Sequence, residues 1–596
     1  MHNNDKPNGN VIDFPPAEDL EGFVDIPPAE DSEPPVIGKV SSTERDPSTS
    51  STFSFWVQNG VLINPFDYVS VENFGGSRTI GVVKEILAPT DAKSHLANYV
   101  SSSFGDVEAE GNTRRVTTVI AWADVAANTG VESPHTRRGR RAVWYPALND
   151  SPVRFATNEE VHLALGMDAL APEDGLPAGV ILRSSGDPLP LLLDRRYVLG
   201  PEAAHVNVSG TSGLAAKTSY LMFLLRLVME YYGNETAAII FNVKQQDLLF
   251  IDEEPAPGFM DDYDRNLYRI LGFGDLDPFT NVRYYFPYHA RDISSVYENP
   301  SEKHAFYYAY ALDDVYDELD LLFSEIDDPQ FTLASIASHV AQDYGRMRFR
   351  RAVNEGYVSI PAGTEVRTWT HLKFFDDFPQ DTIGGGNPRS VLGRFKRHLR
   401  RLTTPSVFVD NRTPTALGGD VYYLGDVIRE SLAPGDIVVV DIQPFEDRIG
   451  TQGFIVGDIV RRLKEAYREN RDRMPRHTVI LIDELNRYVP SGTPLTALGR
   501  EIVDLARVGR AEGVTLFTAQ QFRADIHHQV YENCATSLVG ITGSTELSRP
   551  AYDFLDKQTK AVVGGLEPGE MVLVNRRLKQ PVRIVFPKPP YKRQER

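Results

Sequence analysis

The segment GTSGLAAKTS, residues 210–219, contains the residue types of a phosphate-binding loop in an unusual spacing. The common pattern places four residues between two glycines and follows the second glycine with lysine and then serine or threonine. Here Lys217 comes seven residues after Gly210 instead of six, and Ala216 occupies the position of the second glycine. The segment follows an apolar stretch and precedes an apolar helix, SYLMFLLRLVMEYY. This setting predicts a nucleotide-binding loop with one extra residue.

Such a loop must supply converging backbone N–H groups, a cation and a metal ligand. Gly210 and Gly213 can adopt the unusual backbone angles that turn several N–H groups toward one point. Lys217 can reach the β- and γ-phosphates of ATP, and Thr218 or Ser219 can bind Mg²⁺. The expected nucleotide-binding residues are Gly210, Thr211, Ser212, Gly213, Leu214, Ala215, Ala216, Lys217, Thr218 and Ser219.

Ala216 fits this loop under one condition on its backbone. A Cβ atom is costly at positive φ, which glycine adopts freely. We therefore expect Ala216 to have right-handed helical angles. The extra residue is then expected to widen the loop or to bulge the first turn of the helix.

Two adjacent carboxylates, Asp483 and Glu484, follow an apolar strand in HTVILIDELNRYVP. Ligands of open α/β sheets bind at the carboxyl ends of the strands. Asp483 is expected to hold Mg²⁺, and Glu484 to orient and deprotonate an attacking water. The alternative is a strand that ends in an acidic turn, as DIVVVDIQP does at Asp441.

The segment LARVGRAEGVTLFTAQQ contains a third group of candidate catalytic residues. Gln520 ends a predicted strand, where a glutamine can sense the γ-phosphate. Arg507 or Arg510 can be offered to the phosphates of a neighbouring subunit. In the alternative interpretation an arginine pairs with Asp504 or Glu512, and the glutamine caps a turn.

Bare apolar segments predict strands that are covered on both faces by helices, which is typical of parallel sheets. They are HVNVSG (205–210), AAIIFNVK (237–244), DIVVVDI (436–442), TVILIDE (478–484), VTLFTAQ (514–520) and SLVGIT (537–542). Helical segments such as GFIVGDIVRRLKEAYREN separate several of them. The first strand, the apolar helix and the second strand form a predicted βαβ unit with parallel pairing. The predicted fold class is α/β.

Composition divides the remaining chain into three further parts. Residues 1–52 are an acidic, proline-rich segment predicted to be disordered, with FPPAED and IPPAED twelve residues apart. This repeat is either a doubled peptide ligand or a duplicated linker. Residues 53–200 contain short strands between turn residues and predict a small β-barrel or sandwich. Residues 253–430 are expected to be a mostly helical insertion, so that 201–252 and 431–596 form the core with a C-terminal segment.

Two basic segments are candidate nucleic-acid surfaces. The loop HTRRGRRAVW carries Arg137, Arg138, Arg140 and Arg141. The predicted helix PRSVLGRFKRHLRRL has an apolar stripe opposite a basic face. The stripe comprises Val391, Leu392, Phe395, Leu399 and Leu402, and the basic face comprises Arg394, Lys396, Arg397, Arg400 and Arg401. A solvated surface is the alternative for both segments.

The net charge of −20 argues mildly against nucleic acid, because an acidic protein repels phosphates. Residues 1–50 contribute −8 of this charge, which leaves −12 for the rest of the chain. A nucleic-acid site must therefore be a local basic patch. A single cysteine, Cys534, excludes a disulfide framework, and no run reaches the roughly 18 apolar residues of a membrane helix. We expect a cytoplasmic protein without membrane contact.

The order of these motifs resembles the HerA/FtsK superfamily of ring-forming P-loop ATPases, and HerA in particular. The resemblance rests on the KTS loop, ILIDE and GRAEGVTLFTAQQ, and it spans about residues 53–590. This chain departs from the family's usual sequence in the loop and in FNVKQQDLLF, where many relatives end the strand on an aspartate. It implies a small N-terminal β-barrel, a RecA-like core with a helical insertion, and a C-terminal segment that can contact the neighbouring subunit.

The resemblance also implies a function. HerA proteins are homohexamers that hold ATP between subunits and thread double-stranded DNA through a central pore, with a nuclease partner. Bacterial relatives also occur with effectors such as sirtuin-type enzymes in anti-phage defence. The expected function is therefore an ATP-hydrolysing DNA translocase or helicase with ATP and Mg²⁺ as ligands. The alternative is a nucleotide-stabilised ring scaffold that assembles an effector with little translocation.

Overall fold

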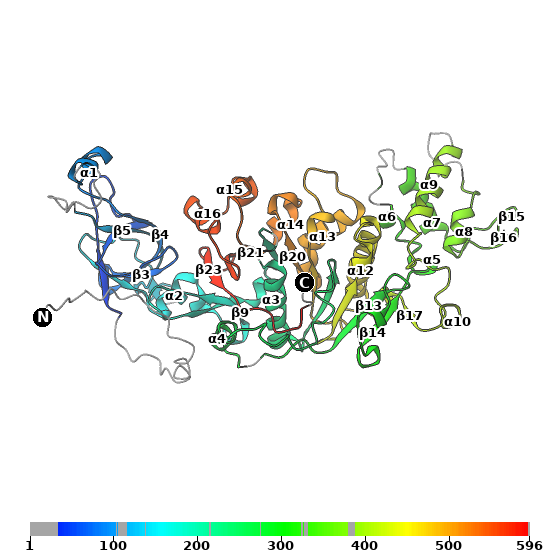
Figure 1. Cartoon of the computed structure of the whole chain (residues 1–596), viewed down its shortest axis with the longest axis horizontal. Coiled ribbons are helices and arrows are strands. Elements are labelled where there is room, and N and C mark those ends of the chain that lie inside the picture. The colour runs from blue at the N-terminus through cyan, green and yellow to red at the C-terminus, as the bar shows by residue number, and fades with distance from the viewer. Residues whose placement is uncertain are drawn as a thin grey trace. The chain divides into compact units, whose positions relative to one another are not determined.

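The computed structural model describes most of the chain between residues 34 and 593. It leaves out residues 103, 105–115, 137–138, 212, 214–215, 275, 324–325, 327–331 and 380–387. Two compact units are present, and Figure 1 labels their elements. Unit 1 comprises residues up to Leu193 with 262–273 and 554–586, and unit 2 comprises 194–261, 274–553 and 587–596.

Unit 1 contains a closed antiparallel barrel, one of the two architectures that the sequence predicts for this region. Around the barrel the strands are β1 (Val36–Val40), β2 (Thr52–Val57), β5 (Val119–Asn128), β4 (Arg78–Leu87), β3 (Tyr68–Glu72) and β8 (Pro152–Phe155). The barrel begins at β1, inside the segment that was assigned to the acidic tail. Ile37 and Val40 are buried in the barrel core, which offsets the polar character of the surrounding sequence.

Besides the short pair β6 (Val131–Glu132) and β7 (Arg140–Arg141), four described strands of unit 1 lie outside the barrel. They are β9 (Gly175–Ile181), β10 (Leu189–Asp194), β22 (Glu570–Asn575) and β23 (Val582–Val585). β22 pairs antiparallel with β23, and β23 pairs antiparallel with β9. The predicted barrel domain, 53–200, therefore extends past the barrel itself, and strands from the C-terminal part of the chain join it.

Unit 2 is built on a parallel sheet, as the bare apolar strands predict. In spatial order its strands are β21 (Thr536–Val539), β11 (Val206–Ser209), β20 (Val514–Gln520), β19 (His477–Ile482), β12 (Thr236–Asn242), β18 (Ile437–Asp441), β13 (Val282–Pro287), β14 (Ala305–Tyr308) and β17 (Val421–Tyr422). β11 and β12 are not neighbours, because β20 and β19 lie between them. The predicted direct pairing of the first βαβ unit is therefore wrong.

The segment 253–430 is less helical than its sequence predicts. It contributes β13, β14 and β17 to the sheet, and β14 lies within 302–326, a segment whose apolar residues have helical spacing. Two short helices follow β14, α5 (Leu312–Val315) and α6 (Leu319–Leu322). The backbone of β14 pairs with β13, and this pairing overrides the helical spacing of its apolar residues. The predicted helices α7 (Thr332–Asp343) and α9 (Pro388–Leu402) are present.

Helices on both faces bury the sheet of unit 2. Side chains such as Ile239 and Ile480 pack in one apolar cluster with α12 (Ile449–Glu469), α13 (Ala497–Glu512) and helices of the insertion. Side chains alternate between the two faces of a strand, so the neighbours of these residues point to the opposite face of the sheet. On that face α3 (Lys217–Tyr232) packs on β11, β20 and β12. The first turn of α3 thus lies at the carboxyl edge of the sheet.

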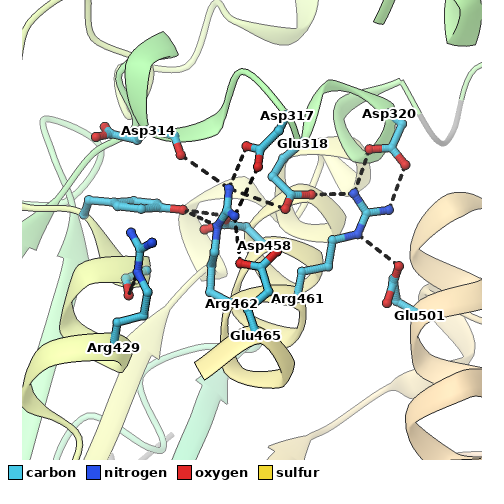
Figure 2. A network of polar contacts seen from close by, with 12 residues as sticks. Asp314, Asp317, Glu318, Asp320, Arg429, Asp458, Arg461, Arg462, Glu465 and Glu501 are labelled. Atoms are coloured by element: carbon cyan, nitrogen blue, oxygen red, sulfur yellow. Dashed lines mark hydrogen bonds and ion pairs between the residues drawn. The ribbon is translucent and has the colours of Figure 1, made fainter. Parts of the chain in front are cut away.

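A partly buried ion-pair network joins α12 to α13, to α6 and to the turn between α5 and α6. Arg461 pairs with Glu318, Asp320 and Glu501, as Figure 2 shows. Arg462 pairs with Asp317 and Glu318 of the turn between α5 and α6, and with Asp458 and Glu465 of α12 itself. Six carboxylates therefore surround two guanidinium groups, and the network holds an excess of negative charge.

Burial raises the pKa of Glu318 to about 8 and the pKa of Asp458 to about 7, against the effect of the neighbouring arginines. In the unfolded chain both carboxyls lose their protons near pH 4. Between that pH and the raised pKa values the folded state binds more protons than the unfolded state. The free energy of unfolding contributed by these groups therefore falls as the pH rises through this window.

Asp458→Asn keeps the size of the side chain and an acceptor for the Tyr423 hydroxyl, 2.9 Å away, but does not titrate. We expect the unfolding midpoint of Asp458→Asn, relative to wild type, to be higher at pH 8 than at pH 6. Thermal unfolding at both pH values measures this difference. Glu465→Gln removes a half-exposed carboxylate from the same arginine and should shift the midpoint equally at both pH values. An equal shift for Asp458→Asn would contradict the pKa assignment.

Candidate functional site

The loop after β11 is held at the carboxyl edge of the sheet by two neighbouring loops. The Gly210 N–H donates to the Gln521 carbonyl at 3.2 Å, and the Thr211 N–H donates to the Ile541 carbonyl at 2.9 Å. Gly210 and Gly213 have φ values of 153° and 81°, so both glycines use the conformations expected of them. Ser212, Leu214 and Ala215 lie outside the described residues.

Ala216 does not have the right-handed helical angles that the sequence argument requires. Its φ and ψ are 44° and 36°, which is the left-handed region. For a residue with a Cβ this conformation costs about 1–2 kcal/mol. The expectation is therefore wrong, and the physical reason is that the chain must reverse its twist directly before α3. Glycine would occupy this position without strain.

Lys217 and Thr218 begin α3 and face the end of β19. The Lys217 ammonium is buried and donates to the Gly210 carbonyl at 2.9 Å, so the side chain folds back over the loop. Burial lowers the pKa of Lys217, and the carboxylates of Asp483 and Glu484 oppose this effect. The Thr218 hydroxyl donates to Asp483 Oδ2 at 3.0 Å. The structure thus brings together five of the predicted site residues, namely Gly210, Lys217, Thr218, Asp483 and Glu484.

Asp483 and Glu484 follow β19 directly, and each has a different environment. Burial raises the pKa of Asp483, while the nearby Lys244 acts in the opposite direction. Glu484 has a left-handed backbone, with φ of 58°, and its carboxylate forms an ion pair with Lys244. Lys244 and Lys217 therefore balance the two carboxylates.

Lys244 is a site residue that the sequence interpretation did not assign. It follows β12, whose carboxyl end lies at the same sheet edge as the loop, and this edge position was the available signal. Asn242 donates to Asp441 Oδ1 at 2.8 Å and to the Gln245 carbonyl at 3.0 Å. Asp441 also pairs with Arg291. These contacts fix the short turn that presents Lys244 to Glu484.

The oxygen atoms of Thr218 and Asp483 fit a magnesium ion. Mg²⁺ binds hard oxygen ligands and commonly takes one or two carboxylates together with phosphate oxygens and water. In the described part of the chain, no cluster of three or more His, Cys, Asp or Glu side chains could hold a metal without other ligands. A metal at Asp483 would therefore depend on a phosphate-containing ligand.

Gln520 does not face the loop. Its side-chain amide exchanges two hydrogen bonds of 3.0 Å with the amide of Asn207 on β11, and it is fully buried. Arg523 donates to the same Asn207 oxygen at 2.9 Å. Gln520 lies on the sheet face opposite α3, because it shares that face with Asn207 and Thr518. The Gln520 side chain therefore points away from the loop, whereas the Gln521 carbonyl accepts the Gly210 N–H.

Arg507 and Arg510 lie far from the loop of their own chain. They belong to the C-terminal half of α13, which runs to the amino edge of the sheet and is followed directly by β20. β20 is seven residues long and spans about 23 Å. Arg510 donates to the Glu202 carbonyl at 2.9 Å, and Arg507 pairs with Asp504 at 2.9 Å, as its alternative interpretation predicts. Neither side chain can reach the glycine loop of its own chain.

The basic helix α9 has the predicted two faces. Phe395 and Leu399 are fully buried, whereas Arg397, Arg400 and Arg401 are exposed. Lys396 forms an ion pair with Asp376, so this member of the basic face is neutralised.

In the other basic segment, Arg140 and Arg141 are exposed in β7 (Arg140–Arg141). Arg137 and Arg138 lie outside the described residues. Among the helices that the structure describes, none combines the length and the apolar character needed to span a lipid bilayer.

No protein-family model and no curated protein matches this chain. The chain is similar to the solved structure of VirB4 of Thermoanaerobacter pseudethanolicus, with a TM-score of 0.41 and 15% identity over 70% of this chain and 97% of that one. It is also similar to the plasmid coupling protein TrwB in complex with ADP and Mg²⁺, with a TM-score of 0.40 and 10% identity over 66% of this chain and 86% of that one. Likenesses this distant carry no functional assignment.

The architecture defines a mixed α/β protein with a closed six-stranded barrel and a large sheet whose carboxyl edge gathers lysines, carboxylates and a glycine loop.

Ala216→Gly tests the strain at the last loop position. We expect it to raise the free energy of unfolding by about 1 kcal/mol, because relief of left-handed strain exceeds the added entropy of the unfolded chain. Ala216→Val should lower it, since a β-branched residue fits this conformation less well. Denaturant titration measures both changes. Ala511→Gly, at an exposed right-handed position of α13, is the matched control and should lower stability. A destabilised Ala216→Gly would contradict the strain.

Proposed function

We propose that this chain is an ATP-driven translocase of double-stranded DNA, of HerA type, with a RecA-like P-loop core that works as a homohexamer. The observation that carries the proposal is the 3.0 Å contact between the Thr218 hydroxyl and Asp483. It places the start of a helix, a lysine and two carboxylates at one point of a parallel sheet edge. Helix N-termini and lysine bind phosphates, and carboxylates bind Mg²⁺ and accept protons.

Each residue has a definite part in this proposal. Lys217 exchanges the neutral Gly210 carbonyl for phosphate oxygens, and Thr218 and Asp483 hold Mg²⁺. The bound ion supplies positive charge that offsets the charge of the phosphates. Glu484 orients a water molecule and accepts its proton when the water attacks the γ-phosphate. Lys244 must release Glu484 for this step, because a paired carboxylate is a weaker base.

The position of α13 supports a ring of subunits. Arg510 and Arg507 lie at the amino edge of the sheet, so an arginine finger from α13 can serve only a neighbouring subunit. ATP sites would then lie between subunits, as in the family that the sequence resembles. Arg510 is the stronger candidate, because a backbone carbonyl is its partner, whereas Arg507 is paired with Asp504.

The exposed face of α9 supports contact with nucleic acid. Arg397, Arg400 and Arg401 concentrate positive charge on one helix of a chain with a net charge of −20. Phosphate contacts need a local cluster of this kind rather than a basic protein. A nuclease or sirtuin-type effector, and a role in DNA processing or anti-phage defence, follow from the sequence resemblance.

A nucleotide-stabilised scaffold that activates an effector is the second candidate. The ion pair between Lys244 and Glu484 favours it, because it holds the proposed base away from water. The burial of Gln520 favours it as well, since a sensor of the γ-phosphate is then missing. Scaffold and motor differ in turnover rather than in binding.

Lys217→Ala and Glu484→Gln separate binding from hydrolysis. We expect Lys217→Ala to weaken ATP binding at least about tenfold, because the buried cation is lost. Glu484→Gln should bind ATP within about threefold of wild type and lower the DNA-stimulated rate about 10²- to 10³-fold. Calorimetry and a phosphate-release assay give the two quantities.

These two variants also decide between the candidates. If wild type and Glu484→Gln hydrolyse ATP equally slowly, with or without DNA, the motor is excluded and the scaffold stands. If Lys217→Ala leaves ATP affinity unchanged, the assignment of the loop fails. Unchanged thermal unfolding midpoints without nucleotide would show that both variants are folded.

Rings assembled from two different variants test whether Arg510 acts on the nucleotide site of the neighbouring subunit. Lys217→Ala and Arg510→Ala are each expected to abolish hydrolysis in a homogeneous ring. In an equal mixture about a quarter of the interfaces join an intact loop to an intact arginine, so part of the activity should return. A mixture that stays inactive after subunit exchange would argue against Arg510 in trans. Arg507→Ala, on the same face but already paired, serves as the control and should retain most activity.

A further inference from the structure

The C-terminal strap, residues 587–593, packs against its own unit beside the start of α3. Tyr591 is buried and its ring lies 6.1 Å from that of Phe279. The Lys592 N–H donates to the Glu253 carbonyl at 2.8 Å, and the Lys592 ammonium bonds the carboxylate of the same residue at 2.7 Å. These contacts fix the strap on its own chain, although the sequence resemblance implies contact with a neighbour.

Arg593 is the last described residue of the strap, and it reaches the loop–helix junction. Its guanidinium donates to the Ser219 hydroxyl at 2.7 Å. It also lies 5.8 Å from the centre of the Phe259 ring and 5.9 Å from that of Tyr591. A cation from the end of the chain thus lies against the first turn of α3.

The partners of Arg593 are neutral, unlike those of the other strap cations. Lys588 pairs with Asp261, and Lys592 pairs with Glu253. Within the part of the chain that the structure describes, no carboxylate forms an ion pair with Arg593. A guanidinium bound to a hydroxyl beside a helix N-terminus is suited to receive an anion, because charge-assisted bonds are the stronger ones.

The orientation of a bound nucleotide follows from the residues that lie on each side of the first turn of α3. Thr218 faces Asp483 and Glu484, so the metal and the γ-phosphate belong on that side. Ser219 is the next residue and points about 100° further around the helix. The α-phosphate and the nucleoside must leave on the side away from the carboxylates. Arg593 lies on Ser219 and therefore on the side where the α-phosphate would pass.

We propose that Arg593 is a nucleotide-binding residue that contacts the α-phosphate of a nucleoside triphosphate, with the strap as part of the binding site. This inference rests on the proposed function, because it uses the same loop and the same ligand. The phosphate would replace the Ser219 hydroxyl as the partner of the guanidinium. The rings of Phe259 and Tyr591 keep the guanidinium in place by stacking.

Arg593→Ala should weaken the binding of both Mg²⁺–ATP and Mg²⁺–tripolyphosphate about tenfold, because the terminal phosphate of tripolyphosphate fills the α position. Arg593→Lys, which keeps the charge, should recover part of this loss. Lys588→Ala removes a cation at the other end of the strap and should leave both affinities near wild type. Calorimetry on the full chain measures them, with thermal unfolding without nucleotide as the check on folding.

Two results would overturn the inference. In the first, Arg593→Ala binds ATP within twofold of wild type while Lys217→Ala does not bind, in which case the proposed function stands without the strap. In the second, the loss is confined to ATP and spares tripolyphosphate, which would move the contact from the phosphate to the nucleoside. If neither Lys217→Ala nor Arg593→Ala changes binding, the loop assignment and this inference fail together.

Discussion

The hydrogen bond between Thr218 and Asp483 is the contact on which the candidate site depends. It joins the first turn of α3 to the end of β19, across 265 residues of sequence. The two groups can meet because β11, β20 and β19 are parallel neighbours whose carboxyl ends are in register. A slip of one residue in either pairing would turn Asp483 to the other face of the sheet. The rigidity of a sheet buried on both faces therefore fixes the geometry of the site.

The charges around this bond are nearly balanced without a ligand. Lys217 and Lys244 offset Asp483 and Glu484, and each lysine has a partner within its own chain. In the proposed function, phosphates would add several negative charges to this edge, so they would fit only if Lys217 turned toward them and Mg²⁺ accompanied them. The ion pair with Lys244 would have to open before Glu484 could act as the proposed base.

The insertion is firmly connected to the core that carries the site. Arg461 and Arg462 on α12 hold α6 and the turn before it through the buried Glu318 and the half-exposed Asp317 and Asp320. The apolar face of α9, with Phe395 and Leu399, belongs to the same cluster as the sheet residues under α12. Positive charge on α9 is thus carried on a packed element rather than on a loop. Motion at the sheet edge can reach the exposed arginines only through this packing.

The sequence by itself determined most of the elements and the position of the adjacent carboxylates Asp483 and Glu484 at a strand end. VTLFTAQ forms β20 with the predicted bounds, and Asp483 and Glu484 follow a strand as expected. Strong periodicity and the position of polar residues at strand ends are local signals, so one sequence suffices to find them. β14 was missed because its apolar aromatic residues fit both helical and strand spacing, and only pairing with β13 decides between the two.

Tertiary structure decided where individual side chains point. Gln520 turns to Asn207, a residue 313 positions away, and Arg593 reaches Ser219 across 374 positions. Lys244 meets Glu484 because β12 and β19 are adjacent, which no local pattern shows. Ala216 takes a left-handed conformation directly before α3, against the preference of a residue with a Cβ atom. Composition and spacing identify what can react, whereas strand order and register decide what each group contacts.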